Sequence, residues 1–175
     1  MNNAHDELDD IFDAIGVTGP ERVTTEFSDD MLIGDKAVHY FIDVLDKRGI
    51  KYLDATPKQQ DQEIDIITKR GTYEIKYQKD PNTVCIEDDD GLGRGWVYYS
   101  KADYLLEINP KHKVIVEFDM VQLRQAYLHD IKDKYTLFKN KQTNGLYGDV
   151  WKGSFRMVPT NYLLKLVTKS RIIYV

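Results

Sequence analysis

The sequence predicts one mixed α/β domain, in which helices flank a central mixed sheet. Its 175 residues fit a single domain, and 42% of them are apolar, which excludes a wholly disordered chain. Local patterns follow the order helix, several strands, helix, strand. The single cysteine, Cys85, excludes an intrachain disulfide and a cysteine metal site and indicates a reducing compartment. We expect Cys85 to be an ordinary core residue.

The first element is a helix over residues 29–48, because acids open this segment and two bases and a glycine close it. On a helical wheel, Asp35 falls on an otherwise apolar stripe formed by Met31, Val38, Ile42 and Leu45. A carboxylate on a buried stripe must be paired, bind a metal ion or line a cavity. The residues before this helix, 1–28, predict an acidic and weakly ordered arm, so we place the folded domain at 29–175.

A β-hairpin is the clearest pattern in the middle of the chain. Residues 63–68 (EIDIIT) and 72–78 (TYEIKYQ) each predict a strand, and the Arg-Gly pair between them is typical of a tight turn. A short strand over 50–53 precedes the hairpin. The polar, Gly-rich segment 79–95 predicts a loop.

The second half of the chain predicts the remaining helices and strands. Asp119 and Gln122 are spaced as a capping box at the start of a helix. The expected elements are strands in the second half of 96–108 and over 113–118, a helix over about 120–132, a loop or short strand over 143–159, a helix over 160–167 and a strand over 171–175.

The net charge of −5 conceals an uneven distribution. Residues 1–35 carry ten acids and one base, whereas residues 110–175 carry twelve bases and five acids, a net of +7. The total argues against a nucleic-acid binder, but the distribution leaves a cationic side that can face phosphate. The alternative is a solvated acidic tail beside an ordinary basic surface.

The beginning of the chain has no basic region followed by an apolar core, so it does not match a secretory signal peptide. No apolar run approaches the roughly 20 residues of a membrane helix. We therefore expect a cytoplasmic protein with no membrane partner.

Carboxylates and a lysine converge at the predicted hairpin. Side chains alternate between the two faces of a strand, so Glu74, Lys76 and Gln78 share one face. Asp65 lies in the middle of the preceding apolar strand, and the hairpin turn brings it beside Glu74 and Lys76. Two carboxylates with a positioned amine favour a Mg²⁺ site that acts on phosphate.

This pattern resembles the core of the PD-(D/E)XK nuclease superfamily, which has the restriction-endonuclease-like fold. That family carries an Asp on one strand of a hairpin and Glu-x-Lys on the next, as in Ile64-Asp65-Ile66 and Glu74-Ile75-Lys76. An acidic residue of the preceding helix often joins them, a place that Asp35 matches. Gln78 matches a Gln that some members carry two residues after the Lys. No proline directly precedes Asp65, a departure that many members share.

The resemblance covers residues 29–108 and implies a mechanism. A weaker part of it, Gly95-Trp96 and Ser100 to Tyr104, is similar to phage-type and Holliday-junction-resolvase-like members. Asp65 and Glu74 would bind Mg²⁺, or Mn²⁺ as a substitute, with the carbonyl of Ile75 as a further ligand and Asp35 acting through water. Lys76 would orient or help deprotonate the attacking water. Gln78 would hold a phosphate or a metal-bound water.

The function that the resemblance implies is Mg²⁺-dependent hydrolysis of phosphodiester bonds in DNA by an endonuclease in phage-like recombination, repair or restriction. Candidate nucleic-acid contacts are Ser100, Lys101, Lys111, Lys113 and Arg124. The alternative is a catalytically inactive protein on the nuclease fold that binds nucleic acid or a protein partner, with the acidic arm as a DNA mimic. Whether the chain forms a homodimer stays open.

Deleting residues 1–28 is expected to tighten DNA binding and to steepen its salt dependence, because the acidic arm repels phosphate. Fluorescence anisotropy of a labelled duplex at several salt concentrations compares the full and truncated chains. Unchanged affinity would show that the arm is only a solvated tail.

Overall fold

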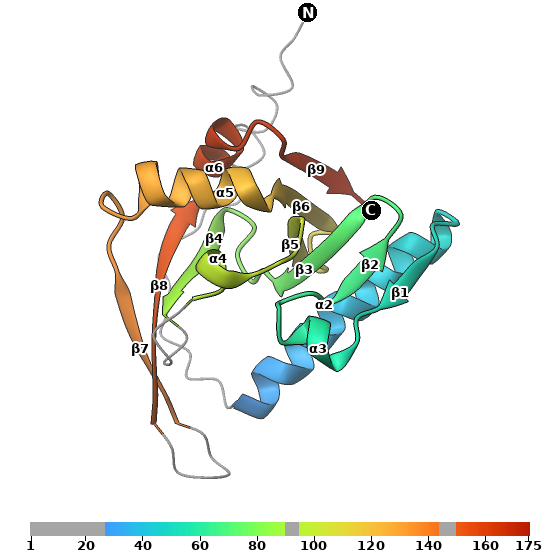
Figure 1. Ribbon diagram of the computed structural model, residues 1–175, viewed down its shortest axis with the longest axis horizontal. Helices are drawn as coiled ribbons and strands as arrows, with labels where there is room; N and C mark the ends of the chain where they lie inside the picture. Colours follow the sequence, from blue (N-terminus) through green and yellow to red (C-terminus); the bar gives the residue numbers. More distant parts are fainter. Residues whose placement is uncertain (1–26, 90–94, 144–149) are drawn as a thin grey trace, which may run out of the picture.

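The computed structural model describes residues 27–89, 95–143 and 150–175, and these form a mixed α/β fold with two sheets (Figure 1). Its helices are α2 (Phe27–Lys47), α3 (Pro57–Gln60), α4 (Trp96–Tyr99), α5 (Met120–Ala126), the π-helical turn η1 (Tyr127–Ile131) and α6 (Thr160–Leu166). Its strands are β1 (Tyr52–Asp54), β2 (Ile66–Thr68), β3 (Gly71–Tyr77), β4 (Thr83–Asp89), β5 (Tyr104–Asn109), β6 (Val114–Asp119), β7 (Phe138–Thr143), β8 (Val150–Pro159) and β9 (Arg171–Tyr174). The predicted acidic arm lies outside the described residues up to residue 26.

The larger sheet has the strand order β1-β2-β3-β5-β6-β9, with β3 and β5 parallel and the other neighbours antiparallel. The predicted hairpin is confirmed as β2 and β3, with Thr68 paired to Gly71 across a two-residue turn. A Cβ atom added to Gly71 would lie 2.8 Å from Oδ2 of Asp103. That oxygen accepts hydrogen bonds from the backbone and hydroxyl of Thr72, so the absence of a side chain lets Asp103 close the hairpin end.

Helix α2 covers one face of this sheet, and its buried stripe differs from the expected one. The stripe is formed by Ala37, Phe41, Val44 and Leu45, which belong to one apolar cluster with Tyr73, Ile75 and Leu106 of the sheet. Val38 and Ile42 are only partly buried, and Asp35 is exposed. The expectation that Asp35 lies on the core stripe was wrong, because the described part of the buried stripe runs through the small Ala37 and leaves Asp35 exposed.

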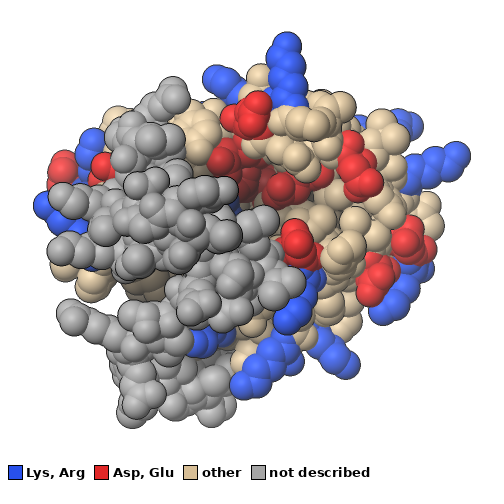
Figure 2. Space-filling view, turned by 90° about the horizontal axis from the view of Figure 1, so that it is seen from below, with Lys and Arg blue, Asp and Glu red and all other residues tan. Residues whose placement is uncertain are grey.

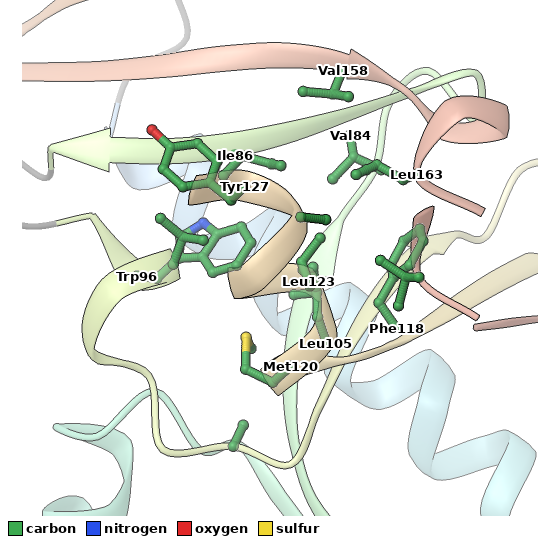
Figure 3. Packing of buried hydrophobic residues seen from close by; sticks show 14 of the residues in the cluster. Val84, Ile86, Trp96, Leu105, Phe118, Met120, Leu123, Tyr127, Val158 and Leu163 are labelled. Atoms are coloured by element: carbon green, nitrogen blue, oxygen red, sulfur yellow. The ribbon is translucent and has the colours of Figure 1, made fainter. Parts of the chain in front are cut away.

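The opposite face of the sheet carries the larger core. Leu105 and Phe118 of the sheet belong to a cluster with residues from α4, α5, η1, α6 and the smaller sheet (Figure 3). The side chains of Leu105, Phe118 and Leu123 are fully buried. At about 25 cal/mol per Å² of apolar surface, this burial is the main stabilising contribution, and it fixes the smaller sheet against the larger one.

The smaller sheet, in the order β4-β8-β7, corrects two expectations. The segment predicted as a loop, 79–95, contains the seven-residue strand β4, and the segment 143–159 contains the ten-residue strand β8. Val84 pairs with Val158 across the two strands, and both are fully buried. Cys85 is exposed rather than buried, because side chains alternate along β4.

The helix expected over residues 120–132 is confirmed but changes character along its length. Asp119 accepts a hydrogen bond from the backbone of Gln122 at 3.0 Å, as a helix cap. The side chain of Gln122 turns instead to Thr168 and to the backbone N–H of Lys169. From Tyr127 the helix continues as the π-helical turn η1. Asp119 therefore caps the helix as predicted, whereas the Gln122 side chain holds the segment that follows α6 instead of completing the capping box.

A buried ion pair joins the smaller sheet to the helices. Arg156 of β8, which is 7% exposed, lies 3.1 Å from the carboxylate of Asp88 on β4. The hydroxyls of Tyr98 and Tyr127 also donate to this carboxylate. Burial would raise the pKa of Asp88, but these hydrogen bonds and the charge of Arg156 hold it below its usual value. Asp88 therefore connects β4, β8, α4 and η1.

Among the described helices, none is both long and apolar enough to cross a bilayer.

Replacing Asp88 by Ala is expected to lower the free energy of unfolding by roughly 3 kcal/mol, because it leaves the buried Arg156 without its counter-charge. Asp130, which pairs with Lys134 on the surface, is the matched control, and its replacement by Ala should cost less than about 1 kcal/mol. Urea unfolding of both variants measures the difference. Equal losses would show that the Asp88 pair contributes no more than a surface pair.

Candidate functional site

The hairpin backbone holds Asp65 against β3. Asp65 lies one residue before β2, but its backbone N–H donates to the carbonyl of Tyr73, so the antiparallel pairing extends through it. Its Oδ2 atom accepts a hydrogen bond of 2.7 Å from the backbone N–H of Ile75. The predicted approach of Asp65 to the Glu-x-Lys segment of β3 is thus present, and one carboxylate oxygen is held by the backbone of that segment.

Lys76 is placed between two carboxylates. Its Nζ atom lies 2.5 Å from Oε1 of Glu74 and 3.2 Å from Oε2 of Glu63. The side chain of Glu74 is 2% exposed, whereas that of Lys76 is 35% exposed. The ammonium of Lys76 therefore lies between solvent and the buried carboxylate of Glu74.

Two further carboxylates belong to this site. Glu63, which adopts a positive φ of 57°, accepts a hydrogen bond of 2.7 Å from the hydroxyl of Tyr99. Glu107 on β5 is paired in register with Lys76 on β3 and is 4% exposed. Both were missed, although the sequence held a signal for each. In the predicted strand over 63–68, Glu63 is two residues before Asp65 and so on the same face, and Glu107 is a charge inside the apolar strand YLLEIN.

Burial dominates the electrostatics of the two most enclosed carboxyl groups. It raises the pKa of Glu74 well above its usual value, although the charge of Lys76 lowers it. It raises the pKa of Glu107 to about 8, although Lys76 and the adjacent Gln78 lower it. In both groups burial favours the protonated form and the charge of Lys76 opposes it.

The partners of Lys76 respond to its charge. Burial would raise the pKa of Glu63, but Lys76 and the hydrogen bond from Tyr99 hold that pKa below its usual value. Burial would lower the pKa of Lys76, but the carboxylates of Glu74 and Glu63 outweigh it and raise the pKa. Burial raises the pKa of Asp65, against the opposing hydrogen bond from Ile75. Lys76 is therefore an ammonium ion at neutral pH.

Three polar atoms in this region have no hydrogen-bond partner among the described residues. They are Oε2 of Glu74, Nε2 of Gln78 and Oε1 of Glu107, and each residue is at least nine-tenths buried. Unpaired buried oxygens on carboxylates need a cation or a donor. Carboxylate oxygens such as those of Asp65 and Glu74 fit a hard divalent cation such as Mg²⁺. In the part of the chain that is described, no three His, Cys, Asp or Glu side chains are already arranged around a metal position.

The other predicted site residues have different surroundings, and the hydroxyl of Ser100 donates to the backbone carbonyl of Glu63 at 3.4 Å. Asp35 is exposed on α2, and no contact between its side chain and the cluster is seen among the described residues. Ser100 is 3% exposed, and Arg124 donates to the backbone carbonyls of Val97 and Ser100 at 2.8 and 2.9 Å. These bonds join α5 to α4 and occupy two of the donors of Arg124, and the phosphate contacts of Ser100 and Arg124 stay predictions. The predicted nucleic-acid contacts that remain exposed are Lys101, Lys111 and Lys113.

Acidic and basic side chains are unevenly distributed on the surface. In the face shown in Figure 2, acidic side chains gather toward the middle, whereas Lys and Arg lie mainly at the margins.

Comparisons of the chain with protein-family models, curated proteins and solved structures give no match. The site is therefore interpreted from its own geometry.

The raised pKa of Glu107 predicts that the protein loses stability as the pH rises from about 4.5 to about 8. Over this window the folded state binds more protons than the unfolded state, so the free energy of unfolding falls. The share of Glu107 is at most about 5 kcal/mol, and Glu107→Gln should flatten the decline. Urea unfolding in EDTA at several pH values measures the free energy of unfolding of both proteins. Parallel pH profiles for wild type and variant would contradict the prediction.

Proposed function

We propose that the protein is a Mg²⁺-dependent nuclease that hydrolyses phosphodiester bonds in DNA. The observation that carries the proposal is the meeting of Asp65, Glu74 and Lys76 on one hairpin. Asp65 contacts the backbone of β3, and Lys76 contacts Glu74 directly. Burial disfavours the ionised form of both carboxyl groups, and a bound divalent cation would stabilise that form.

Each residue has a distinct task in this proposal. Asp65 and Glu74 hold the cation, with the carbonyl of Ile75 as a further ligand. When bound, Mg²⁺ lowers the pKa of water and neutralises charge that develops on the phosphodiester. Lys76 acts as an ammonium donor that orients water and shields the phosphate, because its raised pKa makes it a poor base. Gln78 has an unpaired Nε2 atom that can donate to an anionic oxygen.

The antiparallel hairpin of β2 and β3 supports the proposal. An Asp beside one antiparallel strand of a hairpin and Glu-x-Lys on the next is the arrangement that the PD-(D/E)XK resemblance requires. Here that hairpin is inside a mixed sheet covered by α2 on one face and by the larger core on the other. The exposed Asp35 lends no support to a third carboxylate from the helix.

One observation favours a second function, a non-catalytic protein on the same fold. Lys76 already compensates Glu74 and Glu63, so the site is partly neutralised without a metal ion. A protein that only binds nucleic acid or a protein partner would keep such a self-paired cluster. Cleavage activity separates the two functions.

The proposed function predicts Mg²⁺- or Mn²⁺-dependent cleavage of supercoiled plasmid, single strands or a four-way junction, abolished by EDTA. Asp65→Asn, Glu74→Gln and Lys76→Met should each lower the cleavage rate roughly 10²-fold or more, since each removes charge that contacts the cation or the phosphate. Gel electrophoresis of the products measures the rate.

Asp130→Asn, a change on the surface of η1, serves as the control and should cleave at the wild-type rate. Binding without cleavage of any of these substrates would favour the non-catalytic function. Full activity in the Lys76→Met variant would remove the proposed role of Lys76.

A further inference from the structure

Glu107 occupies the position next to Lys76 on the neighbouring strand. The parallel pairing of β3 with β5 places the Cα atoms of Lys76 and Glu107 in register, so their side chains emerge on the same face. This is the face opposite α2, which packs on Tyr73 and Ile75. Glu107 is 4% exposed and follows the fully buried Leu105 and Leu106.

The carboxylate of Glu107 is incompletely satisfied. Its Oε1 atom has no hydrogen-bond partner among the described residues, and the same is true of Nε2 of Gln78 on β3. Leaving a buried carboxylate oxygen unpaired is costly, and a folded protein keeps such a group only where something else compensates it. Solvent is a poor candidate, because so little of Glu107 is exposed.

A divalent cation on Glu74 would compete with Lys76 for that carboxylate. The ammonium lies 2.5 Å from Oε1 of Glu74, and a divalent cation on that carboxylate would repel it strongly at such a distance. Lys76 has a flexible stem and can turn to another anion within reach. Glu63 already accepts from Tyr99 and is 24% exposed, so it depends less on the ammonium than the buried Glu107 does.

We propose that Glu107 is a positioning residue for Lys76, which exchanges Glu74 for Glu107 when a divalent cation binds to the site. The inference rests on the proposed function, since it requires a cation on Glu74. Glu107 retains the ammonium beside the cation, where it can act on water or phosphate, and keeps it from turning out into solvent. Glu107 itself touches neither the cation nor the substrate.

The experiment follows the Lys76 ammonium by NMR of protein labelled with ¹⁵N-lysine, its signal being identified by its loss in Lys76→Met. Adding Mg²⁺ to the wild type should shift this signal while the ammonium stays protected from exchange with water. In Glu107→Gln, Mg²⁺ should still bind within about threefold of the wild-type affinity by calorimetry, but the ammonium signal should broaden through exchange. The kcat of cleavage should fall roughly 10–100-fold at unchanged KM.

Two variants test whether the effect comes from the charge of Glu107. Glu107→Asp keeps the charge and should restore part of the protection and of kcat. Glu117→Gln is the matched control, because Glu117 is a buried Glu on the next strand that pairs with Arg70 and Arg171 instead of Lys76. It should leave the Lys76 signal unchanged even where it lowers stability.

The outcomes separate the two proposals. A protected and Mg²⁺-sensitive Lys76 signal that depends on Glu107, in a wild-type protein that cuts no substrate, would support the role of Glu107 and reject the nuclease function. Cleavage by the wild type with a Lys76 signal and kcat that are unaffected in Glu107→Gln would overturn the role of Glu107 and leave the nuclease function standing.

Discussion

The ion pair between Lys76 and Glu74 is the interaction on which the site depends. Glu74 lies in the middle of a strand whose neighbours are buried, and its side chain is 2% exposed. A carboxylate in this place costs several kcal/mol unless a charge and hydrogen bonds compensate it. Lys76 supplies the charge from two residues away on the same strand and also reaches Glu63. The same contact that permits burial of Glu74 thus keeps the ammonium in the site.

The crossover between β3 and β5 gives this cluster its remaining members. Between these parallel strands the chain forms β4 and α4, and it then returns to place Glu107 beside Lys76. On the way, Tyr99 in α4 reaches the carboxylate of Glu63. The Asp88–Arg156 pair fixes β4 to β8, and through Tyr98 it fixes α4 as well. A buried ion pair outside the site therefore helps to position the site.

Elements that depend on neighbouring residues could be predicted from the sequence. Elements whose form depends on residues distant in the chain could not. The β2–β3 hairpin and the strands β6 and β9 follow from alternation and turn chemistry within a few residues. β4 was taken for a loop because its partner, β8, is some 70 residues away and its flanks are rich in turn residues. Asp35 was placed on the core stripe because the wheel gave weight to large apolar residues and overlooked Ala37. The proximity of Asp65, Glu74 and Lys76 was predictable because a hairpin is a local structure, whereas the place of Glu107 beside Lys76 depends on the parallel pairing of β3 with β5.

The contacts within the fold show that part of the positive charge in residues 110–175 is used inside the protein. The net charge of +7 over residues 110–175 includes arginines that are committed to the fold. Arg124 donates to carbonyls of α4, Arg156 pairs with Asp88, and Arg171 pairs with Glu117. An arginine held in this way contributes its charge to the general field, while the N–H donors that these contacts use are not available to a phosphate. Contacts to nucleic acid from this half of the chain would thus depend on exposed lysines, which act as point charges without the fixed geometry of arginine. Electrostatic attraction of that kind follows the DNA backbone and carries little sequence preference, so on the proposed function any selectivity of cleavage must come from the shape of the substrate at the carboxylate cluster.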